Sequence, residues 1–155
     1  MIVPHKKLSN IDALQIARFH GFPIKVIMRD GLESIPKIGF YLVNLNKEGE
    51  SGSHWCGLIC REDMAFYFDP YGALPPNDIT QKLKYRYKNK VFFSDFIMQD
   101  LNSILCGYYV MGLFIIVHSF EKTYSLLDII SHFLDYFEEN TKLNDTKLRK
   151  LLEKY

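Results

Sequence analysis

The sequence lacks a disulfide framework, a secretory signal and a membrane-spanning run. Cysteine occurs only three times, at Cys56, Cys60 and Cys106, and an odd number is not typical of small disulfide-stapled proteins. Residues 1–10 carry neither the charged start nor the apolar run of a secretory signal. We therefore expect a protein that is not secreted and that works in a reducing compartment.

An excess of charge is also absent, which excludes binding of nucleic acid by bulk charge alone. Lys and Arg number 19 against 18 Asp and Glu, so the formal net charge is +1. Any basic patch must therefore be local. The longest apolar run, 104–117, is shorter than the about 20 residues that cross a bilayer. It predicts a buried helix and no membrane association.

Apolar and aromatic side chains are abundant, at 48% and 15% of the 155 residues. A disordered chain carries fewer, and no segment shows the bias of a repeat or low-complexity protein. The length suits one hydrophobic core and is too short for two ordinary domains. We expect residues 1–155 to form a single domain and to act as a monomer.

Hydrophobic spacing and turn residues predict an α+β fold. Ser9 and Asp12 form a capping pair for a helix that ends at His20-Gly21. Short β-branched or aromatic stretches predict strands, and apolar residues at helical spacing predict helices. The expected strands are 22–28, 40–45, 54–60, 66–69 and 91–93, the further helices are 79–87, 106–120, 126–137 and a short one near 148–152, and 47–53 is a polar loop. Together they predict a small mixed sheet with helices packed around it.

The strands at 54–60 and 66–69 form a predicted hairpin whose turn length decides which side chains meet. A two-residue turn puts Asp69 opposite His54, whereas a four-residue loop puts it opposite Cys56 and diagonal to His54 on the same face. In both registers an imidazole meets a carboxylate. A carboxylate held against one ring nitrogen stabilises the imidazolium and leaves the other nitrogen as a general base.

Cys106 is the candidate nucleophile for that base. It lies where the polar stretch 99–103 gives way to the apolar helix, and Gly107 follows it. The positive end of a helix dipole and a nearby His⁺ both lower the pKa of a thiol. Unpaired backbone N–H groups at this helix end can bind an oxyanion, and the amide of Gln99 or Asn102 can supply a second donor.

Three motifs occur in one order along the chain: His54-Trp55, then Asp69-Pro70-Tyr71-Gly72, then the segment 99–107 with Gln99, Asn102-Ser103 and Cys106-Gly107. They resemble the signatures of adenain, the adenovirus maturation protease. The clan of ubiquitin-like-protein proteases shares the order His, Asp, Gln, Cys, and proteases of large DNA viruses, virophages and Polinton-type elements are related. The resemblance covers about residues 9–120. It departs from adenain at Asp69, where adenain has Glu, and in the shorter chain.

The resemblance implies a papain-like or adenain-like cysteine protease fold with its nucleophile at the start of a buried central helix. Cys106 would attack the peptide carbonyl, His54 would act as base, and Asp69 would orient His54. Gln99 and the Cys106 backbone N–H would form the oxyanion hole. The substrate contacts that we expect are Trp55, Asn102 and Gly107.

The resemblance also implies a biological setting. The substrates would be viral capsid or core precursor polypeptides, cut after small residues, in the virion and in the host cytoplasm or nucleus. No cofactor is required for this mechanism, and activation by DNA or by a viral peptide is a hypothesis that the resemblance adds.

Basic residues alternate with Leu83, Tyr85 and Tyr87, and no acid interrupts them. In an extended segment they would form one face suited to phosphates, and the alternative is a solvated edge strand protected by lysines. The residues are Lys82, Lys84, Arg86, Lys88 and Lys90. Because adenain-like enzymes use viral DNA as a cofactor, DNA binding by this segment is a hypothesis.

Other interpretations stay open. His54, Cys56 and Cys60 share one strand face, but the paired Cys-x-x-Cys that usually marks zinc is absent. We therefore expect no metal site and treat Cys56 and Cys60 as core thiols. One rival function is a protease of the same clan that removes ubiquitin-like modifiers from host conjugates. Another is a catalytically silent module that binds DNA or capsid protein.

Overall fold

The computed structural model describes residues 1–46 and 54–155, so the polar loop expected at 47–53 lies outside the described residues. One sheet has the strand order β1-β2-β3-β4-β5. The β1/β2 and β4/β5 pairs are parallel, and the β2/β3 and β3/β4 pairs are antiparallel. The predicted mixed sheet is confirmed. Its strands are β1 (Ile24–Met28), β2 (Gly39–Asn44), β3 (Trp55–Cys60), β4 (Ala65–Phe68) and β5 (Val91–Phe93).

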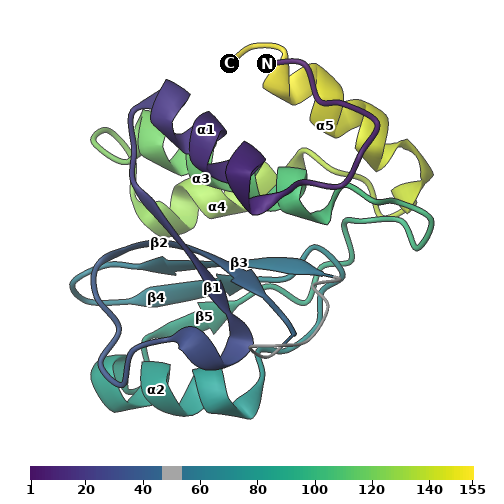
Figure 1. The fold of residues 1–155 in the computed structure, drawn as a ribbon. Coiled ribbons are helices and arrows are strands. Elements are labelled where there is room, and N and C mark those ends of the chain that lie inside the picture. The colour runs from purple at the N-terminus through teal and green to yellow at the C-terminus, as the bar shows by residue number, and fades with distance from the viewer. Residues whose placement is uncertain (47–53) are drawn as a thin grey trace.

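Helices cover both faces of this sheet, which makes the predicted α+β fold (Figure 1). Helix α2 lies on one face, and α1, α3, α4 and α5 lie on the other. Both termini are on the side of α5, where the Met1 ammonium donates to the Leu152 carbonyl at 2.8 Å. The helices are α1 (Asn10–His20), α2 (Asn77–Tyr87), α3 (Cys106–Phe120), α4 (Leu126–Asp135) and α5 (Asn144–Leu152), with 3-10 turns η1 (Arg29–Gly31) and η2 (Thr141–Leu143).

Helix α3 is the buried central helix that the apolar run predicts. Its residues are buried from Cys106 through Val117, because apolar side chains occur on every face of the helix. Gly57 of β3 lets the helix approach the sheet closely, since a Cβ there would lie 2.7 Å from Val110 Cγ1. Within residues 1–46 and 54–155, no helix is long and apolar enough to cross a membrane.

Residues 77–87 form helix α2, which confirms the helix predicted at 79–87, so the basic residues do not form the single face that an extended segment would give. In a helix, alternate residues point in different directions. Lys82 and Arg86, one turn apart, donate to backbone carbonyls of Leu32 and Pro36. The side chains that stay exposed are those of Lys84, Lys88 and Lys90. DNA binding itself stays a prediction.

Candidate active site

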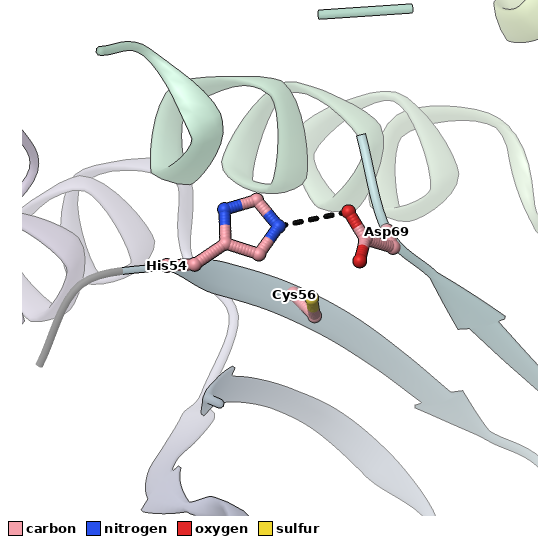
Figure 2. A group of neighbouring side chains, drawn as sticks. All are labelled: His54, Cys56 and Asp69. Carbon is pink, nitrogen blue, oxygen red and sulfur yellow. Dashed lines mark hydrogen bonds and ion pairs between the residues drawn. The ribbon is translucent and has the colours of Figure 1, made fainter. Parts of the chain in front are cut away.

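The hairpin of β3 and β4 brings His54 to Asp69. Cys60 pairs with Ala65, which confirms the four-residue loop and puts Asp69 opposite Cys56. His54 Nε2 lies 2.8 Å from Asp69 Oδ1, and the second ring nitrogen points away from the carboxylate (Figure 2). The Asp69 side chain is only 2% exposed and that of His54 is 15% exposed. The predicted imidazole–carboxylate pair is confirmed.

A tight turn after β4 fixes the Asp69 carboxylate. Asp69 Oδ1 also accepts a hydrogen bond from the Tyr71 backbone N–H at 2.8 Å, and the Gly72 N–H donates to the Asp69 carbonyl at 2.8 Å. Gly72 has φ +74°, and a Cβ there would lie 2.6 Å from the Asp95 carbonyl oxygen. Glycine is therefore required at this turn for both conformation and space.

Tyr71 covers the His54 ring, a contact that the sequence analysis missed. Its ring stacks on the His54 imidazole with centroids 4.8 Å apart and an interplanar angle of 24°. Such stacking restricts the imidazole to one orientation and, when His54 is protonated, adds a cation–π attraction. The aromatic residue of the Asp69-Pro70-Tyr71-Gly72 motif could have predicted this contact.

Cys106 is the first residue of α3 and is 8% exposed. Burial raises the pKa of its thiol, but the His54 side chain and the backbone N–H groups of Trp55 and Gly107 stabilise the thiolate, so the net pKa is lowered. Burial lowers the pKa of His54, but its hydrogen bonds to Asp69, Cys106 and Cys56 outweigh burial and raise it. The lowered pKa of Cys106 and the raised pKa of His54 together favour a thiolate–imidazolium pair.

The thiol pKa of the other two cysteines is shifted in the opposite direction. Cys56 and Cys60 are both free thiols and completely buried. Burial is the largest cause that raises the pKa of each to about 11. Both are buried, as expected of core thiols, but Cys56 also contacts His54, and of the three cysteines only Cys106 has a lowered pKa.

Gln99 lies beside the same turn and lines the same cleft as Cys106. The backbone N–H groups of Met98 and Gln99 both donate to the Pro70 carbonyl, at 3.0 and 2.9 Å. The Gln99 amide nitrogen donates to the Ser103 carbonyl at 3.1 Å, which leaves its second N–H available as a donor. The amide oxygen is buried without a hydrogen-bond partner. Its role in an oxyanion hole stays a prediction.

The segment that leads into Cys106 is anchored to the C-terminal helix, which the sequence analysis did not foresee. Asp145 Oδ1 of α5 accepts hydrogen bonds from Ser103 Oγ and from the Tyr109 hydroxyl, both at 2.8 Å. Ser103 Oγ in turn accepts the Leu105 backbone N–H at 3.1 Å. The carboxylate therefore holds the chain immediately before and after Cys106.

Of the three residues expected to contact substrate, one lines the cleft and two do not. Trp55 lines the cleft and donates from Nε1 to the Leu8 carbonyl at 2.9 Å. Gly107 is buried behind it, and a Cβ there would lie 2.6 Å from Leu8 side-chain atoms and 3.0 Å from Trp55 Cδ1. Asn102 is exposed on the loop. Neither Gly107 nor Asn102 lines the cleft, so the expectation that they contact substrate there lacks support.

A cleft of ≈ 870 Å³ opens onto the sulfur and the imidazole. Its lining includes the N-terminal segment 7–10, residues 26–28 of β1 with Gly31, and the loop residues Gln99, Ser103 and Ile104. Cys106 and His54 line the same cleft. A cleft that opens onto a thiol and an imidazole is the expected place for a substrate.

Metal-ligating side chains also meet at this place. His54, Cys56 and Asp69 each offer one ligand atom, and these atoms lie within 4.8 Å of one another. Cys60, which shares the strand face of Cys56, is not part of this group. Figure 2 shows the three side chains at the ends of β3 and β4.

Comparisons with known proteins give a distant likeness in fold. No family model matches this sequence, and no curated protein matches it. Among solved structures, the crystal structure of the ASFV pS273R protease is similar, with a TM-score of 0.43 and 18% identity. The alignment covers 72% of this chain and 42% of that chain, so this chain spans less than half the length of the ASFV protease. None of these comparisons connects the chain with adenain itself, and that part of the resemblance stays a prediction.

Proposed function

We propose that this protein is a cysteine endopeptidase with Cys106 as nucleophile and His54 as acid and base. The observation that carries the proposal is the Cys106 thiol beside an imidazole whose Nε2 is bound to a buried Asp69 at 2.8 Å. A lone buried cysteine is ordinarily inert. A thiol at a helix N-terminus beside an imidazolium is the arrangement that supplies a thiolate near neutral pH.

In the proposed reaction the Cys106 thiolate attacks the peptide carbonyl. The backbone N–H of Cys106, which has no partner within the first turn of α3, and the free N–H of Gln99 receive the charge on the oxygen. The His54 imidazolium then gives its proton to the leaving amine, and neutral His54 activates the water that hydrolyses the acyl-enzyme. Asp69 keeps the ring in the orientation that these steps need.

The resemblance to adenain supports viral capsid or core precursors as substrates, with cleavage in virions and at the site of assembly. The cleft suits an extended polypeptide, which agrees with cleavage of a precursor strand. Removal of ubiquitin-like modifiers from host conjugates is the rival within the same chemistry. That reaction needs a broad surface for a folded substrate.

The test compares cleavage termini, identified by mass spectrometry, in virions made with the natural chain and with Cys106→Ala. We expect precursor cleavage to disappear in this variant and to persist in Cys60→Ala, which removes a buried cysteine outside the site. Persistent cleavage in Cys106→Ala would exclude the nucleophile proposed here. Hydrolysis of modifier conjugates without cleavage of precursors would favour the rival substrate class.

A further inference from the structure

Cys56 is a buried thiol that the proposed mechanism does not use, yet it lies beside two residues that the mechanism needs. The β3/β4 register puts it directly opposite Asp69, and His54 lies immediately before β3, two residues before Cys56. An imidazole nitrogen, a thiol sulfur and a carboxylate oxygen thus converge within 4.8 Å (Figure 2). These are the three ligand types that zinc prefers in proteins.

The spacing of the three ligand atoms suits a tetrahedral metal ion. With Zn–S near 2.3 Å and Zn–N or Zn–O near 2.0–2.2 Å, neighbouring ligand atoms of such a site lie about 3.3–3.8 Å apart. Here the His54 Nε2 to Asp69 Oδ1 distance is 2.8 Å, and none of the distances exceeds 4.8 Å. Admitting the ion would therefore require the histidine–carboxylate pair to open by about 0.5 Å and any separation near 4.8 Å to shorten by about 1 Å.

An independent feature points to the same position. Tyr67 lies on the same side of β4 as Asp69, two residues before it, and is completely buried. Its hydroxyl has no hydrogen-bond partner that meets normal geometry, and its electrostatic neighbours are Cys56 and Asp69. An unpartnered buried hydroxyl is costly, and a metal-bound thiolate next to it would accept a hydrogen bond from it.

We propose that Cys56 Sγ, His54 Nε2 and an Asp69 oxygen form an inhibitory site for a thiophilic divalent cation, with Zn²⁺ as its natural class. Entry would be from the cleft, which His54 lines with a 15% exposed side chain. Binding releases to solvent the thiol proton of Cys56 and the proton shared by His54 Nε2 and Asp69. A fourth ligand would be water.

The inhibition, but not the metal binding, rests on the proposed function. A metal ion on Nε2 separates the ring from Asp69. It also acidifies the remaining ring N–H less than a proton would, so His54 becomes a poor proton donor to the leaving amine. The enzyme would thus be silent with metal bound and active after a chelator removes it.

Metal binding is tested without catalysis, by titrating Co²⁺ into the full-length Cys106→Ala chain. We expect an equimolar thiolate-to-cobalt charge-transfer band, because Cys56 remains. The band should vanish in Cys56→Ala/Cys106→Ala and persist in Cys60→Ala/Cys106→Ala, the matched control from the same strand. A band that survives the loss of Cys56, or that never forms with Cys56 present, overturns the proposal. Circular dichroism and a second variant, Cys56→Ser, guard against misfolding.

Inhibition is tested on the chain with Cys106 intact, using peptide hydrolysis in buffered Zn²⁺. With each chain compared against its own metal-free rate, we expect Cys56→Ala to need at least about 10-fold more Zn²⁺ for half-inhibition. Equal sensitivity would mean that Zn²⁺ acts through Cys106 and His54 alone, which contradicts the proposal. A chain without hydrolase activity that still shows the cobalt band would overturn the protease and keep the metal site.

Discussion

At the scale of single residues, chemistry depends on which atoms surround each thiol. Cys106 has an imidazole and two backbone N–H groups within reach, and these lower its thiol pKa. Cys56 and Cys60 are completely buried, and burial is the largest cause that raises the pKa of each, although Cys56 also lies beside His54 and Asp69. The same side chain is therefore the candidate nucleophile at one position and a thiol that stays protonated near neutral pH at two others.

This contrast predicts selective alkylation. As pH rises, a thiol becomes reactive when it passes its pKa. That pKa is below the ordinary range for Cys106 and about 11 for Cys56 and Cys60. At about pH 6–7 we expect iodoacetamide to label Cys106 alone, as measured by peptide mass spectrometry. Uniform slow labelling of all three would favour the catalytically silent module.

Asp69→Asn is expected to lower kcat by about 10²–10⁴, because the ring loses its orienting charge. The pKa of His54 should fall, so less imidazolium is present to stabilise the Cys106 thiolate. The pH at which Cys106 reacts should therefore rise. Asp63→Asn, at an exposed position in the same hairpin loop, is the control. Equal activity of both variants would remove Asp69 from the mechanism.

Tyr71→Ala is expected to lower kcat/KM about 2–10-fold, in line with the about 0.5–1.5 kcal/mol of an aromatic stacking contact. Tyr71→Phe keeps the ring on His54 and should stay close to the natural chain. The pH profile distinguishes positioning from folding, since loss of the stacked ring should shift the limb that reports His54. Identical profiles in both variants would contradict a positioning role.

At the scale of elements, the site depends on α5 although α5 contributes nothing to the cleft lining. Asp145 holds both Ser103 and Tyr109, on either side of Cys106. The start of α3 is also closed from the other side, where Gly107 packs on Leu8 and Trp55. The nucleophile is thus held between the N-terminal segment and the C-terminal helix.

Asp145→Ala is expected to destabilise the fold by about 1–3 kcal/mol, because two hydroxyl donors lose a charged acceptor. Loosening of the segment before Cys106 should also lower kcat more than it changes KM. Urea unfolding and steady-state kinetics measure the two effects. Asp135→Ala, at an exposed carboxylate of α4, should change neither, and a neutral Asp145→Ala would show that the anchor is dispensable.

At the scale of the whole molecule, charge is spread without a dominant field. The net charge is +1, and α2 divides its basic residues between loop carbonyls and solvent. Lys84, Lys88 and Lys90 are the members of the predicted set that remain exposed. DNA contact by this segment must therefore use these three.

Replacement of Lys84, Lys88 and Lys90 by Glu is expected to abolish salt-dependent DNA affinity, measured by fluorescence anisotropy at several salt concentrations. Each lost phosphate contact should reduce the slope of log K against log salt by about 0.9. Substitution of Lys6, Lys122 and Lys154, which lie elsewhere on the chain, is the matched control for charge. Affinity that is unchanged, or absent in the natural chain, removes the DNA hypothesis.

Local sequence determined much of this protein. The helix from Cys106 to Phe120 follows from a run that is apolar on every side, and α1 follows from the Ser9–Asp12 capping box. The meeting of His54 with Asp69 was also determined, because both possible registers of the hairpin put them on one face. Each of these features depends on residues close together along the chain, where spacing alone decides geometry.

Tertiary structure decided the rest. The choice between the two hairpin registers, the stacking of Tyr71 on His54 and the anchoring of Ser103 by Asp145 depend on packing that no local pattern encodes. The sequence predicts the helix at 79–87, but only the fold shows that Ile79, Leu83 and Tyr87 bury one face of it against the sheet. Packing between distant segments supplies the energy for these choices, and only the folded chain contains it.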